Sequence, residues 1–311
     1  WFFSQIKISM DELRRILISA CGPILGIATI GFFGIYRAES LQFTDESNLI
    51  TSGGFGPNQV ASALGMGAMF ALMFLVLRKN SPLLKVFVFG LMLFLTAQGA
   101  LTFSRGGLYN AVGATVLASV YLLKDSRMRR SLMGVLLVAV VLGAFVIFPR
   151  LESLTGGKLT DRFSDTNTTR RYDIAVDDLS LWYYYPVLGV GPGRSPYYGV
   201  RMAHTEFTRL PAEHGTFGLV ALLLLLVAAI KVIRKADSNR DKAIAVLLIG
   251  WSFLYMLNAA MRLVAPSFVF GLAFAMVVSE TNSQLVRFLT QLLKVKLSKG
   301  RLSQATALLG K

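Results

Sequence analysis

Arginine and histidine side chains supply the chemistry that this 311-residue sequence could perform. Its only two histidines, His204 and His214, lie in one stretch, AHTEFTRLPAEHGTFGL (203–219). A histidine can accept a proton near neutral pH, so it can activate a hydroxyl group as a nucleophile. The planar guanidinium group of arginine keeps its charge and binds pairs of phosphate oxygens. Together, these residue types predict group transfer on a substrate that carries phosphate.

Three stretches carry the candidate site residues. Arg105, in LTFSRGG, lies at the end of an apolar run, where a charged side chain must reach water or bind an anion. Arg171 precedes the turn GVGPG (189–193), whose glycines let the backbone approach a ligand closely. His204 lies in the third stretch. Further candidate substrate-binding residues are Arg170, Arg194, Arg209, His214 and Arg262.

Ordinary structural roles could explain each of these residues separately. Arg105 and Arg262 could extend to the membrane surface, and the outer arginines could pair with outer carboxylates. A single loop histidine is usually structural. The one cysteine, Cys21, excludes an intrachain disulfide and a multi-cysteine metal site. The outer segments contain no DxD pair and no histidines one helical turn apart, so we expect neither metal nor cofactor.

Apolar segments must position these residues. Hydrophobic residues make up 54% of the chain and charged residues 16%, a composition typical of a membrane protein. An apolar run of about 20 residues can cross the bilayer as a helix, because a helix satisfies its own backbone polar groups. The predicted fold class is therefore all-α, a polytopic transmembrane helix bundle. We expect about eight spans, at 16–36, 59–77, 83–103, 107–123, 131–149, 214–233, 243–261 and 263–280.

Basic residues predict the orientation, because positively charged loops stay in the cytoplasm. With the N-terminus inside, the inner segments hold 21 of the 32 basic residues and 6 of the 17 acidic ones. The whole net charge of +15 then lies on the cytoplasmic side, so it indicates membrane topology and requires no nucleic-acid partner. The outer basic residues are ten arginines and one lysine, Lys158, which favours phosphate binding on that side.

The chain divides into four expected parts. Residues 1–149 hold the first five spans, 150–213 form a long extracytoplasmic loop with the candidate active site, and 214–280 hold the last three spans. Residues 281–311 form a basic amphipathic tail, typical of a helix on the inner leaflet. Within the loop, 170–185 has apolar residues at helical spacing and predicts a surface helix. The first residue is Trp1, so we expect the sequence to begin partway into a longer protein.

Four stretches, in this order, resemble the O-antigen ligase and O-antigen polymerase superfamily of bacterial envelope proteins. They are GFGPNQVAS (54–62), FSRGGL (103–108), Arg171 with YPVLGVGPG (185–193), and His204-Thr205-x9-Gly215-x-x-Gly218. The last is similar to the ligase motif His-[Asn/Ser/Gln]-x9-Gly-x-x-Gly. The four stretches cover about residues 54–220, and their order is more specific than any one of them alone.

The resemblance implies a glycosyltransferase on the periplasmic side of the bacterial inner membrane. It would move a glycan from an undecaprenyl-diphosphate carrier to an acceptor hydroxyl, with inversion and without metal. Arg105 and Arg171 would hold the diphosphate, and His204 would orient or deprotonate the acceptor. A diphosphate departs already ionised, so it needs cationic stabilisation more than a general acid. The partners would be the lipid-linked donor, a glycan or lipid A–core acceptor, and the lipid bilayer.

Some features depart from the family pattern. Thr205 stands where the ligase motif has Asn, Ser or Gln, and Ala175 replaces a tryptophan often found four residues after the loop arginine. Family members usually have about twelve spans, so we expect about four more before this sequence. The motifs do not separate ligase from polymerase. Two other classes stay open: a transporter or flippase for lipid-linked saccharides, which would favour charges at the midplane, and a structural membrane subunit.

Overall fold

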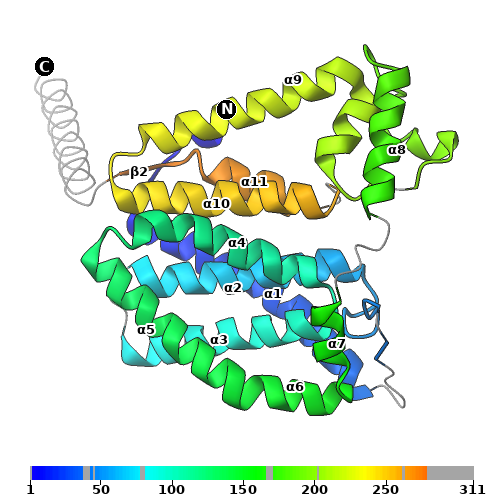
Figure 1. Cartoon of the computed structure of the whole chain (residues 1–311). Coiled ribbons are helices and arrows are strands. Elements are labelled where there is room, and N and C mark those ends of the chain that lie inside the picture. Colours follow the sequence, from blue (N-terminus) through cyan, green and yellow to red (C-terminus); the bar gives the residue numbers. More distant parts are fainter. Residues whose placement is uncertain are drawn as a thin grey trace, which may run out of the picture.

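The computed structural model describes residues 2–37, 43–44, 46–77, 81–165, 171–201, 203–260 and 263–278. Helices dominate this part of the chain (Figure 1). The long helices are α1 (Met10–Arg37), α2 (Pro57–Leu77), α3 (Pro82–Leu101), α4 (Arg105–Leu122), α5 (Ser126–Leu142), α9 (Glu206–Lys235) and α10 (Asn239–Asn258). The short ones are η1 (Phe3–Gln5), η2 (Gly143–Ile147), α6 (Phe148–Thr155), α7 (Lys158–Ser164), α8 (Arg171–Tyr184), η3 (Ser195–Tyr198) and α11 (Ala265–Leu272).

The predicted all-α membrane bundle is confirmed. Among the described residues, six helices are long and apolar enough to cross a membrane: α1, α2, α3, the continuous helix Ser126–Thr155, α9 and α10. The helix Ser126–Thr155 joins α5 and α6 through the π-helical turn η2, so it extends beyond the expected span at 131–149 at both ends.

The structure differs from the expected eight spans at two places. The fourth expected span is α4, a helix of 18 residues that packs inside the bundle but is not among the six apolar helices. The eighth, expected at 263–280, is wrong: α11 has only 8 residues, about 12 Å of helix, which is shorter than the hydrocarbon core. The chain then forms strand β2 (Met276–Val278), which pairs in parallel with β1 (Lys7–Ser9).

Helix α2 lies at the centre of the bundle. It packs against α1, α3 and α4, and α4 in turn packs closely against α10. Nearly all of the apolar stretch of α2 is buried, because its neighbours cover it on every side. By contrast, α9 lies at the edge, and most of its apolar side chains are exposed. The core of the bundle is therefore α2, α4 and α10.

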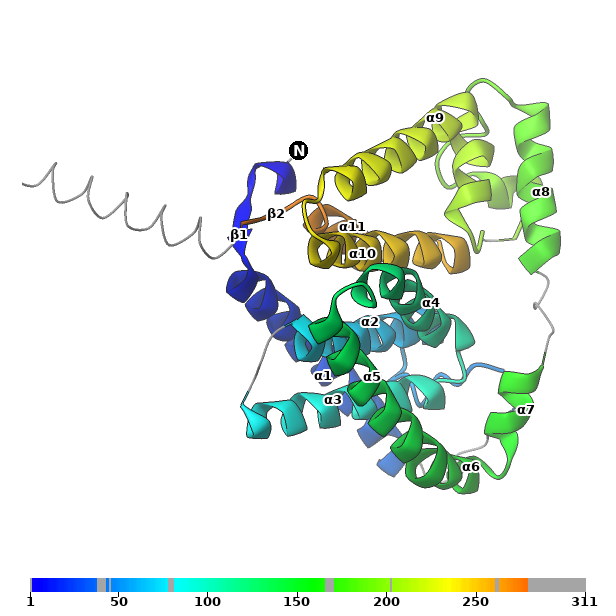
Figure 2. The ribbon, with the colours of Figure 1, turned by 60° about the vertical axis from the view of Figure 1, so that its left-hand side comes forward.

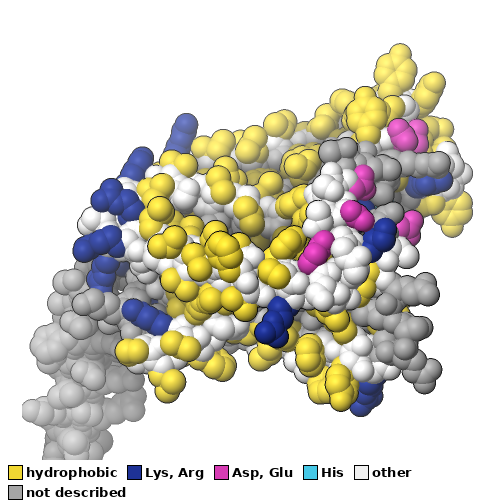
Figure 3. All heavy atoms as spheres, turned by 60° about the horizontal axis from the view of Figure 1, so that its bottom comes forward, with side chains coloured by type: hydrophobic (Ala, Val, Ile, Leu, Met, Phe, Trp, Pro, Cys, Tyr) yellow, Lys and Arg dark blue, Asp and Glu magenta, His cyan; other side chains and the backbone are white. Residues whose placement is uncertain are grey.

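Helices α7 and α8 lie at one end of the bundle, which we call the α8 end (right in Figure 1). Helix α8 runs across the direction of the long helices, as the second view also shows (Figure 2). This confirms the helix predicted at 170–185. On the face drawn in Figure 3, lysine and arginine side chains gather without acidic ones at the opposite end, and the acidic side chains lie together with several basic ones toward the α8 end. A broad belt of hydrophobic side chains separates the two.

Candidate active site

The first two motif stretches meet where α4 begins. The hydroxyl of Ser104 donates a hydrogen bond to Oδ1 of Asn58 at 2.5 Å, which joins FSRGGL to GFGPNQVAS. Gly107 lies so close to α2 that a Cβ at this position would overlap the backbone of Ala61. A glycine is therefore required for α4 to pack against α2 here. This packing fixes Arg105, the first residue of α4, at the α8 end.

The other two motif stretches meet at a sharp break in α9. Gly215 adopts φ 59° and ψ −139°, a conformation that L side chains rarely adopt, so α9 consists of two arms that meet at this residue. The turn 186–191 docks onto the break. Thr216 donates its N–H to the Pro186 carbonyl at 2.8 Å, and the N–H of Val190 donates to the Ala212 carbonyl at 2.9 Å. The Gly/Pro turn and the histidine motif are therefore one structural unit.

Asn258, the last residue of α10, connects these two units. Arg171 at the start of α8 donates a short hydrogen bond to Oδ1 of Asn258. The amide of Asn258 occupies the space beside Gly106 that a Cβ there would fill. The start of α4, the end of α10 and the start of α8 therefore converge at one place, although they are far apart in the sequence.

Three guanidinium groups gather at this place, and we call Arg105, Arg162 and Arg171 the arginine cluster. Burial, and then the positive charges of Arg105 and Arg162, lower the pKa of Arg171 from its ordinary value. A lowered pKa means that the surroundings of Arg171 disfavour its cation. The group stays charged at neutral pH, so a bound anion would relieve this repulsion.

Arg162 braces the cluster from α7. Its side chain is buried, and its Nε donates to the Phe103 carbonyl at 2.9 Å. Phe103 has a φ of 57°, which turns the chain sharply just before Arg105. Arg105 donates to the Asp165 carbonyl, and the Asp165 carboxylate lies 4.0 Å from Arg105 and 3.6 Å from Arg162. The cluster is therefore a held arrangement and not a set of loose surface side chains.

Helix termini add to the positive potential. Arg105 is the first residue of α4, and Arg171 is the first residue of α8. The N-terminus of a helix presents unpaired N–H groups and the positive end of the helix dipole, which favour a nearby anion. Both helix termini therefore add to the positive potential of the arginine cluster.

His204 lies directly before α9, half-buried, next to the capping residue Thr205. Thr205 accepts the N–H of Phe207, so its hydroxyl caps the helix. The Phe207 ring lies 6.3 Å from the Phe253 ring, and Phe253 is on α10, five residues before Asn258. Phe207, three residues after His204, therefore packs against α10, the helix whose last residue binds Arg171.

The remaining sequence candidates have different surroundings. Arg209 binds two buried carboxylates: Glu206 at 2.8 Å and Glu213 at 3.1 Å. Arg194 is exposed at the start of η3, and His214 is half-buried immediately before the break in α9. Arg170 and Arg262, and the tail 281–311, lie outside the described residues.

A buried carboxylate joins α8 to α9. Asp178 accepts the hydroxyl of Thr208 at 2.8 Å on one oxygen, and its other oxygen has no hydrogen-bond partner among the described residues. Burial raises the pKa of Asp178 to about 6; the Thr208 hydroxyl lowers it, Glu213 and Asp177 raise it, and Arg209 lowers it. Asp178 therefore exchanges its proton only slightly below neutral pH.

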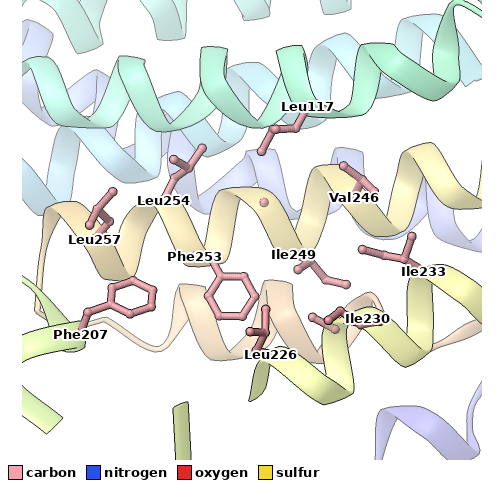
Figure 4. Close-up of a pocket in the computed structure, with 12 residues that line it drawn as sticks. Leu117, Phe207, Leu226, Ile230, Ile233, Val246, Ile249, Phe253, Leu254 and Leu257 are labelled. Carbon is pink, nitrogen blue, oxygen red and sulfur yellow. The ribbon is translucent and has the colours of Figure 1, made fainter. Parts of the chain in front are cut away.

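An apolar groove leads away from the site between α9 and α10. Its volume is about 440 Å³, and every lining side chain is hydrophobic. Phe207 and Leu257 lie at one end, and Ile233 and Val246 lie at the other (Figure 4). Leu257 precedes Asn258 in the chain, and Phe207 follows His204 by three residues. The groove therefore begins beside the residues that hold Arg171.

Arg162 and Asn258 were missed by sequence reasoning. Arg162 belongs to the arginine-rich outer set, but its surroundings in LTDRFSD match no motif. Asn258 is an uncharged residue at the end of an apolar helix, so no local pattern distinguishes it. Only the enrichment of arginine over lysine pointed toward Arg162.

The model of the O-antigen ligase family matches residues 90–223. The match includes Arg105, Arg162, Arg171 and His204 and ends within α9. No curated protein matches the chain. The apolar helices and the family match place the protein in the bacterial inner membrane. Residues 90–223, less than half of the chain, match the O-antigen ligase family, and this match supports the resemblance of the chain to the O-antigen ligase and polymerase superfamily of membrane glycosyltransferases.

Proposed function

We propose that this protein transfers a glycan from an undecaprenyl-diphosphate carrier to an acceptor hydroxyl, by an inverting reaction that needs no metal. The observation that carries this proposal is the arginine cluster, in which Arg105, Arg162 and Arg171 converge at the α8 end, and in which burial and then the charges of Arg105 and Arg162 lower the pKa of Arg171. The acceptor is a growing glycan or lipid A–core. The ligase and polymerase versions share the same bond chemistry.

The cluster stabilises the leaving group. The acceptor oxygen forms a bond to the anomeric carbon while the bond from that carbon to the diphosphate oxygen breaks. The electron pair of the broken bond stays on undecaprenyl diphosphate, so negative charge grows on the phosphate oxygens. Arg105 and Arg171 hold these oxygens, and cations fixed in advance stabilise such charge more effectively than mobile water does. Attack from the face opposite the leaving group inverts the anomeric carbon.

His204 receives the proton of the acceptor hydroxyl. A neutral imidazole takes this proton as the new carbon–oxygen bond forms, and releases it to water afterwards. Its place at the start of α9 suits this role, because Phe207 ties that segment to α10 close to the residue that binds Arg171. The imidazole then approaches the acceptor side while the arginines hold the donor.

The apolar groove supports a lipid-linked donor. An undecaprenyl chain is a long hydrocarbon, and a groove lined by leucine, isoleucine, valine and phenylalanine side chains accepts it without desolvating polar groups. Leu257 lies at one end of the groove (Figure 4), and the next residue in the chain, Asn258, binds Arg171. A diphosphate at the cluster can therefore continue into hydrocarbon along α9 and α10.

The distribution of charge supports an extracytoplasmic site. Lysine and arginine side chains gather at the end opposite to α8 on the face in Figure 3, and positively charged segments stay in the cytoplasm. The α8 end would then face the periplasm. Cysteine accessibility tests this: Arg194→Cys, at an exposed position, should react with a membrane-impermeant maleimide in intact spheroplasts. Labelling only after lysis would contradict the orientation.

The central test uses single substitutions in a reconstituted transfer assay with an undecaprenyl-diphosphate glycan. His204→Ala and Arg105→Ala should each abolish transfer while the protein still inserts at normal levels. Arg201→Ala is the matched control, because Arg201 is an exposed arginine of the same loop and should retain full activity. Near-normal transfer by both site variants would remove the proposed mechanism.

Metal independence is tested in the same assay. The reaction should continue unchanged in EDTA, because the arginine cluster supplies the cationic charge that a divalent metal supplies in other transferases. Activity that stops with EDTA and returns with Mg²⁺ would contradict this part of the proposal.

A further inference from the structure

Helix α8 has two apolar faces, and α9 covers one of them. Ile174 and Leu181 are buried against α9, together with Asp178. A second row follows the same helical spacing: Tyr172, Val176, Leu179 and Tyr183, with exposed fractions of 73%, 42%, 43% and 79%. At about 100° per residue, this row lies about half a turn away from the buried face. We call these four residues the α8 stripe.

We propose that the α8 stripe is a binding track for the glycan chain of the lipid-linked donor. The inference rests on the proposed function, because it assumes that the diphosphate is held at the arginine cluster. It adds a second binding site, on a different face of α8, that takes sugar residues and not phosphate or lipid.

The composition of the stripe and its border suits a carbohydrate. Sugar rings have a C–H face that packs on an aromatic ring, and a tyrosine offers a large, rigid surface with a polar edge. Asp173, Asp177 and Ser180 are exposed along one border of the stripe, where their oxygens can accept hydrogen bonds from sugar hydroxyls. The tyrosines can therefore contact the C–H face of a sugar ring, and the acceptors beside them can bind its hydroxyl groups.

The stripe continues directly from the site. Tyr172 is the residue after Arg171, whose guanidinium group belongs to the arginine cluster. From Tyr172 to Tyr183 the helix rises about 16 Å, which is longer than a single sugar ring. A glycan attached to a diphosphate at Arg171 therefore enters the track with its first sugars and lies along α8 with the following ones.

The same border argues against the other occupants of an exposed apolar row. Asp173 and Asp177 lie about a quarter to a third of a turn from the centre of the stripe, so a bilayer or a second copy that covered the stripe would bring its apolar edge against these carboxylates, which is unfavourable. A polar polymer is the occupant that leaves them hydrated.

The test compares two donors, one with a single repeat unit and one with many. The double variant Tyr172→Ala/Tyr183→Ala should raise KM for the long donor about five- to tenfold, because two aromatic contacts are lost. Its kcat should stay unchanged, and its KM for the single-repeat donor should rise less, because a shorter glycan covers less of the stripe. Tyr36→Ala is the matched control: Tyr36 is 80% exposed but lies at the end of α1, and both of its KM values should equal those of the wild type.

A second measurement separates this proposal from the proposed function. Free glycan, cleaved from its lipid diphosphate, should bind the purified wild type in saturation-transfer NMR and bind the double variant much more weakly. A wild type that transfers nothing but binds free glycan through these tyrosines would overturn only the proposed function. Equal KM for the long donor and equal free-glycan binding in variant and wild type would overturn the track. A change of oligomeric state in the double variant, without a change in KM, would assign the stripe to a dimer contact instead.

Discussion

Two arginine environments at the same end of the molecule have opposite electrostatics. In the arginine cluster, burial and then repulsion from Arg105 and Arg162 lower the pKa of Arg171. Arg209, which follows later in the chain on the short arm of α9, is held by the carboxylates of Glu206 and Glu213. Both kinds of arginine belong to the same arginine-rich outer set in the sequence.

The difference separates an arginine that we propose binds an anionic ligand from one that already has its counter-ions. Repulsion within the cluster costs folding free energy, and an anionic substrate would return it on binding. The carboxylates around Arg209 instead fix the short arm of α9, which follows His204. A substitution in the arginine cluster should therefore lower activity and leave stability nearly unchanged. A substitution of Arg209 should lower stability and change activity much less.

The largest expected effect is on activity, from Arg171→Gln. Loss of a charge that holds the leaving diphosphate should lower kcat/KM about 100- to 1,000-fold. The Tm should stay the same or rise slightly, because the repulsion within the cluster is reduced. Transfer kinetics and thermal unfolding in detergent check both statements. A large drop in Tm would show that Arg171 is structural, and Arg171 and Arg209 would then not differ in the way described.

The next effect is on stability, from Arg209→Met. Glu206 and Glu213 would stay buried without their cation, which should cost about 3 kcal/mol of unfolding free energy. Activity per folded molecule should change far less than in Arg171→Gln. Adding Glu213→Gln should recover part of the lost stability, because it removes one of the unpaired charges. A stable but inactive Arg209→Met would place this arginine at the substrate instead.

The smallest effect concerns pH, from Asp178→Asn. The pKa of Asp178 is about 6 in the folded protein, against an ordinary value of 3.8. Between these values the folded state holds a proton that the unfolded state has released, so wild-type stability falls as pH rises through this window. The variant has no such titrating group, so between pH 4 and pH 7.5 its free energy of unfolding should rise by about 1–3 kcal/mol relative to that of the wild type. Parallel pH profiles of Tm would contradict the assignment.

Much of the site was predictable from local sequence. Arg105 and Arg171 stood out because a charge at the end of an apolar run needs a reason, and the helix over 170–185 followed from its spacing. The structure then brings the predicted pair close enough for their charges to interact. The role of His204 stays a prediction.

Other features required the three-dimensional packing. Arg162 and Asn258 reach the site through α7 and α10, and neither lies in a recognisable local pattern. The segment 263–280 is apolar enough to suggest a span, yet α11 ends at Leu272 and the chain pairs as a strand with Lys7–Ser9. Hydropathy reports the affinity of a segment for an apolar environment, and it does not distinguish lipid from the interior of the bundle.

Gly106 matters because of its contact with Asn258, although a glycine has no side chain that could take part in a reaction. The amide of Asn258 fills the space beside Gly106 while its oxygen holds Arg171, so one uncharged residue sets the spacing between two helix starts. Adding even a methyl group at 106 would displace that amide and leave the guanidinium group of Arg171 without its support. A screen for inactive variants should therefore recover substitutions at Gly106, a residue that has no side chain, together with substitutions in the arginine cluster.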